Sequence, residues 1–177
     1  MRLEVIKVSE IESDEAVWAR AAQAGDQAAF GHLYGRYARM VHGVLLAYVS
    51  FGEAEDLVQD VFVTALKRLE TLREAGAVGA WLATIARNLA HDQRRRRRPW
   101  VALMDRFSQP DAGRVEAMAA LQEIQKLPEA YRETLVLRLV EGMTGPEIAA
   151  RTGLTPDSVR VNLCRGMKML RERLEIR

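Results

Sequence analysis

The stretch TGPEIAARTGLTPDSVRVNLCRGMKMLRERL, residues 144–174, predicts two helices joined by a tight turn. Thr144 and Glu147 stand at capping-box spacing, which marks the start of the first helix. Gly153 can adopt the positive φ that ends a helix, and Thr155 is then placed to cap the second helix. A proline follows in the first turn of each helix, where its missing N–H costs little.

Two helices joined by a short turn that contains glycine form a helix-turn-helix, whose second helix enters the major groove of DNA. An arginine on that helix can pair with a guanine edge, and a good pair is worth about 1–3 kcal/mol of discrimination. The alternative interpretation is an ordinary α-hairpin, but the basic outer face favours DNA binding. The residues expected to face DNA are Thr155, Asp157, Ser158, Arg160, Val161, Asn162, Cys164, Arg165 and Lys168.

The rest of the chain shows the same helical periodicity and almost no alternation typical of strands. Residues 99–113 interrupt the pattern with two prolines and a glycine, so they predict a domain boundary. The predicted fold is therefore all-α, with two small helical domains joined by a linker and the helix-turn-helix in the second. The expected domains are residues 13–98 and 114–177, joined by the linker at 99–113.

Composition excludes several classes of protein. The chain has 177 residues, is 49% hydrophobic and contains one cysteine, Cys164, which excludes a disulfide scaffold and a cysteine-built zinc site. We expect no metal site and no cofactor. No apolar run reaches the length of a membrane helix, and the N-terminus has no apolar signal core. We therefore expect a cytoplasmic protein with no membrane insertion, in which Cys164 is a small side chain rather than a redox switch.

The run DQRRRRRPW, residues 92–100, follows a predicted helix whose outward stripe includes Thr84, Arg87, Asn88 and His91. Consecutive arginines point around a helix, so they cannot form one ordered reading edge. They suit phosphates, which position a protein on nucleic acid without carrying sequence information. Asn88, by contrast, can hydrogen-bond to the edge of an exposed base.

Four stretches together resemble the extracytoplasmic-function group of bacterial RNA polymerase sigma factors of the sigma-70 family, over nearly the full chain. GDQAAFGHLYGRY is similar to the opening helices of that family, and AEDLVQDVFVTAL to its segment that docks on the polymerase clamp. AWLATIARNLAHDQRRRRR resembles its promoter −10 segment. The segment from LPEAYRETLVLRLV to the helix-turn-helix resembles its −35-binding module.

The resemblance implies an initiation factor that directs core RNA polymerase to promoters, contacts its clamp and flap regions, and has no enzymatic activity of its own. It also implies an anti-sigma factor as regulator and a nucleoid location when the factor is bound to polymerase. The residues implied to bind the clamp are Asp56, Gln59, Asp60 and Phe62. The residues implied to bind the −10 element are Arg73, Trp81, Thr84, Arg87, Asn88, His91, Asp92, Arg94, Arg95, Arg96, Arg97 and Arg98, with the loop at 71–79.

The sequence departs from the family pattern at two places. The −10 loop lacks the usual aromatic-arginine-glycine start and reads Leu72, Arg73, Glu74. Val161 and Asn162 replace a common serine and arginine, and valine can touch a thymine methyl but cannot donate a hydrogen bond. We therefore expect an altered −35 preference.

Two other functions are compatible with parts of the sequence. A dimeric operator-binding regulator could use the same helix-turn-helix and would bind duplex DNA without polymerase. An enzyme is disfavoured because no phosphate loop or nucleophile motif is present and the three histidines are not at metal-ligand spacing.

Overall fold

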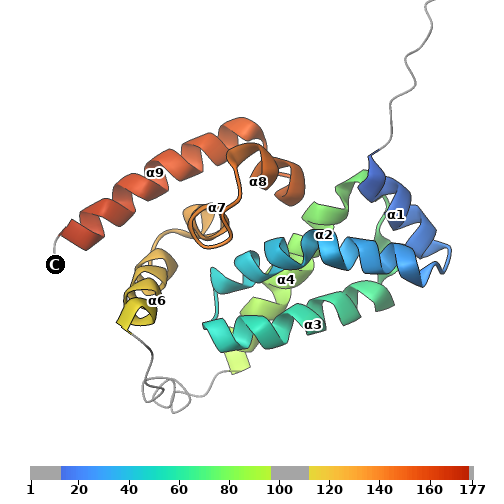
Figure 1. Cartoon of the computed structure of the whole chain (residues 1–177), viewed down its shortest axis with the longest axis horizontal. Coiled ribbons are helices and arrows are strands. Elements are labelled where there is room, and N and C mark those ends of the chain that lie inside the picture. Colours follow the sequence, from blue (N-terminus) through green and yellow to red (C-terminus); the bar gives the residue numbers. More distant parts are fainter. Residues whose placement is uncertain (1–12, 97–111, 176–177) are drawn as a thin grey trace, which may run out of the picture.

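The computed structural model describes residues 13–96 and 112–175, and its regular elements within those ranges are all helical (Figure 1). The expected all-α fold is confirmed. Residues 99–111 of the predicted linker, together with Arg97 and Arg98, lie outside the described part of the chain.

The first half contains four helices with clear start signals. The Ser13 hydroxyl accepts from the Ala16 N–H, and the Asp26 carboxylate accepts from two backbone N–H groups. Ser50 and Glu53 form a reciprocal capping box at the third helix. The elements are α1 (Asp14–Gln23), α2 (Gln27–Leu46), α3 (Phe51–Lys67), the 3-10 turns η1 (Leu69–Thr71) and η2 (Ala75–Ala77), and α4 (Val78–Arg96).

One detail of the predicted boundaries is wrong. The loop predicted at 71–79 is shorter than expected, because η2 occupies its middle and Val78 and Gly79 already belong to α4.

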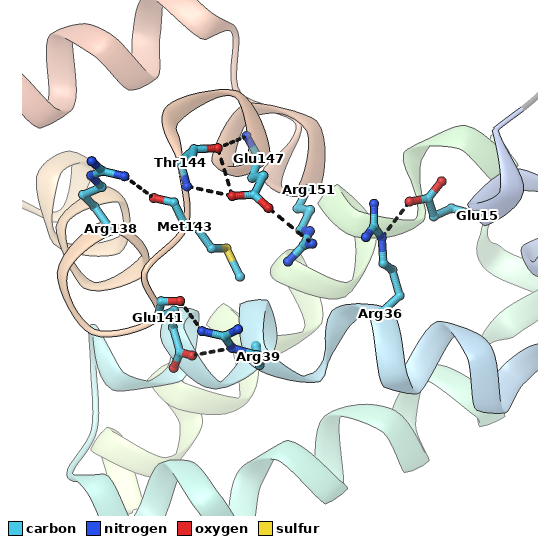
Figure 2. Close-up of polar contacts among 9 residues, drawn as sticks. All are labelled: Glu15, Arg36, Arg39, Arg138, Glu141, Met143, Thr144, Glu147 and Arg151. Carbon is cyan, nitrogen blue, oxygen red and sulfur yellow. Dashed lines mark hydrogen bonds and ion pairs between the residues drawn. The ribbon is translucent and has the colours of Figure 1, made fainter.

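The second half contains the predicted helix-turn-helix. The Thr144 N–H donates to the Glu147 carboxylate at 2.8 Å, while the Thr144 hydroxyl oxygen accepts from the Glu147 N–H (Figure 2). Gly153 ends the first of its helices with φ of 74°. The elements are α6 (Ala112–Gln125), α7 (Glu129–Leu139), α8 (Gly145–Thr152) and α9 (Pro156–Glu175).

The two halves pack directly on each other. Helix α7 lies against α2, and α8 lies against α4, so both stand between α9 and the first four helices (Figure 1). Buried side chains from both halves form one continuous cluster, which includes Leu33, Leu45 and Leu82 from the first half and Leu135 and Ile148 from the second.

Glycines allow the two halves to approach at backbone distance. A Cβ atom at Gly79 of α4 would overlap the carbonyl oxygen of Arg151 in α8. A Cβ at Gly153 would lie 2.7 Å from the Cβ of Ala80. In α2, a Cβ at Gly43 would lie 2.6 Å from Leu137 Cδ2 of α7. Each of these distances is below van der Waals contact, so a larger residue would have to displace the Arg151 backbone at Gly79, Ala80 at Gly153 or the Leu137 side chain at Gly43.

Candidate nucleic-acid interface

A cationic cavity of about 800 Å³ opens beside the second half of α4. Asp92 is paired with Arg95, whereas within the described residues the side chains of Arg68 and Arg94 have no acidic partner. A site of this kind can hold phosphates through its arginines while Asn88 offers both a donor and an acceptor to a base. The lining residues are Arg68, Asn88, His91, Asp92, Arg94 and Arg95.

Arg68 is a cavity residue that the sequence-based assignment missed. It follows the last residue of α3, whereas the other lining residues all belong to α4. Helical spacing shows that Arg68 faces outward, but only the packing of α3 on α4 brings it to Asn88. No signal within the local sequence connects the two positions.

Other residues predicted for the −10 element lie away from this cavity. The Thr84 hydroxyl donates to the Ala80 carbonyl oxygen of its own helix at 2.9 Å. Trp81 is half-buried and packs against the core. Arg73 and Arg96 are exposed and do not line the cavity.

The predicted loop at 71–79 precedes and enters the first turn of α4, and none of its residues lines the cavity. Gln23 of α1 fixes its start by donating to the carbonyl oxygens of Leu69 and Leu72 at 3.0 and 2.8 Å. Asn88 lies ten residues beyond Val78, which corresponds to about 15 Å along a helix. The structure therefore does not bring Arg73 and Asn88 into a single pocket.

Arg87 is engaged by the second half of the chain. Its Nε and Nη2 atoms donate to the two carboxylate oxygens of Glu133 in α7 at 2.6 and 2.9 Å. These charge-assisted bonds raise the pKa of Arg87 above its usual value. In this arrangement of the halves the Arg87 guanidinium is therefore paired with Glu133, and its contact with the −10 element stays a prediction.

The predicted DNA-facing side of α9 is mostly exposed. Val161 and Asn162 are half-buried, and Asn162 also lines a cavity of about 220 Å³ between the two halves, together with Tyr48, Arg87 and Glu133. The fully exposed members of the predicted set are Thr155, Asp157, Ser158, Arg160, Cys164, Arg165 and Lys168.

The predicted clamp-binding residues do not share one environment. Asp56, Gln59 and Asp60 are exposed on α3. Phe62 is only 4% exposed, and its ring lies against those of Phe30 and Tyr34. The Phe62 side chain therefore supports the α2–α3 packing from inside, and its contact with the clamp stays a prediction.

The described residues contain no group of three or more His, Cys, Asp or Glu side chains that could hold a metal ion. Within the same part of the chain, no helix is long and apolar enough to cross a membrane.

Comparison with known proteins agrees with this architecture. The family model for sigma-70 region 2 matches residues 33–99, and the model for sigma-70 region 4 matches residues 117–170. The RNA polymerase sigma factor CarQ of Myxococcus xanthus is 33% identical over 85% of this chain and 91% of CarQ. The ECF RNA polymerase sigma-E factor of Escherichia coli strain K12 is 29% identical over 91% of this chain and 94% of the relative.

A solved structure shows the same fold. CnrH, solved in complex with the cytosolic domain of CnrY, matches 93% of this chain and 99% of its own with a TM-score of 0.66 and 28% identity. The order of the two matched regions coincides with the two packed halves, one with the cationic cavity and the other with the helix-turn-helix. The chain therefore belongs to the extracytoplasmic-function group of RNA polymerase sigma factors.

Proposed function

We propose that the two halves of this sigma factor divide promoter recognition between them. As a member of its family, the chain is a transcription initiation factor that directs core RNA polymerase to promoters and is not an enzyme. In our proposal residues 13–98 bind the polymerase clamp and the −10 element, residues 99–113 link the domains, and residues 114–177 read the −35 duplex beside the polymerase flap.

The cationic cavity beside α4 is the observation that carries this assignment. Duplex DNA would not present an exposed base to a single asparagine among arginines, whereas a melted −10 strand would. Arg94, Arg95 and Arg68 would hold the phosphates, and Asn88 would contact the base. The exposed α9 surface around Arg160 and Arg165 has the helix geometry needed for the major groove.

The same assignment of surfaces indicates which proteins bind this chain. Asp56, Gln59 and Asp60 form an exposed acidic-polar surface on α3, away from the cationic cavity, which suits a protein rather than DNA. CnrH has been solved bound to the cytosolic domain of CnrY. On that likeness we assign this chain a protein regulator of the anti-sigma type and a nucleoid location when it is bound to polymerase.

Transcription from a genomic DNA pool, with purified core polymerase and this protein, tests the proposal. We expect a restricted set of start sites that share −35 and −10 elements and that are absent with core polymerase alone. Binding to duplex promoter fragments should be weak without core polymerase. Tight, palindrome-specific binding by the protein alone, with no promoter-dependent transcript, would contradict the proposal.

A further inference from the structure

We propose that Gln23 of α1 is a positioning residue for the loop that precedes α4, and that the base preference within the −10 element depends on its amide. The inference rests on the proposed function where that function assigns the loop at 71–79 to the −10 element. It goes further because it gives α1, which lies outside every predicted DNA-binding segment, a part in promoter selection.

The side-chain amide of Gln23 joins the end of α1 to the turn that follows α3. Its Nε2 atom donates to the Leu69 carbonyl oxygen at 3.0 Å and to the Leu72 carbonyl oxygen at 2.8 Å. A glutamine amide nitrogen carries two hydrogens, so this contact uses both of its donors. The Leu69 oxygen also accepts from the Leu72 N–H, so Gln23 completes a turn that the backbone has already begun.

The Leu72 carbonyl belongs to the peptide unit that also contains the N–H of Arg73. Because a peptide unit is planar, a bond that holds its oxygen fixes the direction in which the chain leaves Leu72. The side chains of Leu69 and Leu72 are buried, whereas those of Arg73 and Glu74 are exposed. Gln23 therefore acts at the point where the chain passes from the core into the exposed part of the loop.

The turn held by Gln23 begins at a residue of the cationic cavity. Arg68 lines that cavity, and its carbonyl oxygen accepts from the N–H and from the hydroxyl of Thr71, at 2.8 and 2.7 Å. These bonds make the segment from Arg68 to Leu72 one ordered turn around η1. Gln23 thus binds the middle and the end of a segment that has Arg68 before it and Arg73 after it.

The end of α1 is itself held in place by backbone hydrogen bonds. The Gly25 N–H donates to the Ala22 carbonyl oxygen and the Asp26 N–H to that of Ala21, each at 3.0 Å, which is the Schellman arrangement. This arrangement requires a residue with positive φ, and Gly25 supplies it with φ of 97°. Asp26 in turn caps α2. Gln23, the last residue of α1, therefore extends from a fixed corner between two helices.

The role of the amide can be tested because other side chains anchor the same turn. Leu69 and Leu72 belong to the hydrophobic core, together with Ala19 and Ala22 of α1. Glutamine, methionine and lysine have nearly equal helix propensities, so exchanges at position 23 should leave α1 intact. Methionine removes both donors, whereas lysine keeps an ammonium group with three.

Hydrogen exchange measures whether the amide orders the loop. In Gln23→Met we expect faster exchange than in the wild type over residues 69–77, with unchanged exchange in α2 and α7. Gln23→Lys should exchange at the wild-type rate. Gln27→Met is the matched control, because Gln27 is an exposed glutamine at the start of α2, just beyond the same corner. Unchanged exchange in Gln23→Met would overturn the positioning role.

Promoter binding measures whether this order matters for recognition. Each holoenzyme is assayed on −10 and −35 variants of a promoter mapped by transcription. We expect Gln23→Met to lose about tenfold of the discrimination at a −10 position, in the range of one lost base contact. Its discrimination in the −35 element should equal that of the wild type, and Gln23→Lys should restore the −10 profile.

A merely stabilising role would give a different pattern. Gln23→Met would then weaken binding without changing base preference, or would lose discrimination in both elements together. Either result would overturn the proposal, and so would a Gln23→Lys holoenzyme that behaves like Gln23→Met.

A variant of the loop itself separates failure of this inference from failure of the proposed function. The combined change Arg73→Ala and Glu74→Ala should alter the −10 profile if the loop contacts the promoter. An altered profile there, beside a wild-type profile in Gln23→Met, would contradict the role of Gln23 alone. Wild-type profiles in the loop variant, in Asn88→Ala and in Gln23→Met would contradict the −10 assignment of the first half and the role of Gln23 with it.

Discussion

At the scale of single residues, Arg68 adds a cation to the α4 cavity from a neighbouring helix. We expect Arg68→Ala to weaken holoenzyme binding to a single-stranded −10 probe and to lower the salt slope by about 0.7, the value for one phosphate on single strands. Lys67→Ala is the control, because Lys67 is exposed on the same helix but does not line the cavity. Equal effects of the two changes would argue against a specific role of Arg68.

Asn88 and the neighbouring arginines should differ in what they change. We expect Asn88→Ala to alter the preferred base in the −10 element, because an amide contacts base edges. Paired replacement of Arg94 and Arg95 by alanine should weaken binding to all promoters by a similar factor, because phosphates carry no sequence information. Binding to a library of −10 variants distinguishes the two effects, and a promoter-selective loss from the arginine changes would refute this division.

Sequence reasoning reached some of these residues and missed others for a physical reason. Helical spacing alone places Asn88, His91 and Arg95 on one side of α4, so they could be predicted together. Phe62 shares the apolar stripe of α3 with Val58 and Ala65, but only the structure shows that the rings of Phe30 and Tyr34 in α2 cover it. No sequence pattern connects Glu133 with Arg87, and only tertiary packing brings the two side chains together.

At the scale of helices, the capping box at the start of α8 makes the stability of the helix-turn-helix depend on pH. The Thr144 N–H and hydroxyl donate to Glu147 and hold the pKa of its carboxyl below the ordinary value of 4.5. The charged form is therefore favoured in the folded state. Its stabilising effect is complete above the ordinary pKa and is lost as the pH falls through the lowered value.

Acidification from neutral pH to below the ordinary pKa of Glu147 should lower the melting temperature of the wild type. We expect the same change of pH to lower the melting temperature of Glu147→Gln by less. Glutamine can still cap the helix but does not titrate in this range. Thermal melts across the pH series measure the difference. Glu172→Gln is the control, because it removes one exposed carboxylate from α9 far from a helix start. Parallel pH curves for all three proteins would contradict the role of Glu147.

The helices themselves could be predicted well because their signals are local. Caps at Ser13, Thr144 and Thr155 and the turn glycine Gly153 mark boundaries that the structure confirms within a few residues. The short η2 turn had no such signal, because Ala75, Gly76 and Ala77 offer neither a capping side chain nor a helical repeat of apolar residues. The loop before α4 was therefore predicted too long.

At the scale of the whole molecule, the continuous core couples the stability of the two halves. We expect unfolding in urea to give coincident transitions for circular dichroism and for a dye on Cys164 in the second half. In Gly43→Gln the two transitions should separate, because a Cβ at this position would lie 2.6 Å from Leu137 Cδ2 of α7 and would disturb the packing of α7 on α2. Gly35→Gln is the control, because Gly35 lies on the same helix with open space around it. Coincident transitions in Gly43→Gln, with the midpoint of Gly35→Gln, would show that this packing does not couple the halves.

The packing of the halves could not be predicted from the sequence. Periodicity identifies which face of each helix is apolar, but it does not say which other helix covers that face. Nothing in the sequence distinguishes Gly43 and Gly79 from other glycines, and the close approach of Leu137 and of the Arg151 carbonyl oxygen is visible only in the structure. The charged contacts were hidden for the same reason, since Arg87 and Glu133 are 46 residues apart.

The cavity shared by Arg87, Glu133 and Asn162 has a thermodynamic consequence for the two promoter elements. If both elements bind only an arrangement in which the two halves have separated, binding of either element lowers the free energy of separation that the other must supply. Linkage then requires the effect to be reciprocal: a −35 duplex tightens the binding of a −10 strand by the same factor as the strand tightens the duplex. Two segments of DNA that never touch would thus act as allosteric effectors of each other through one arginine–glutamate pair.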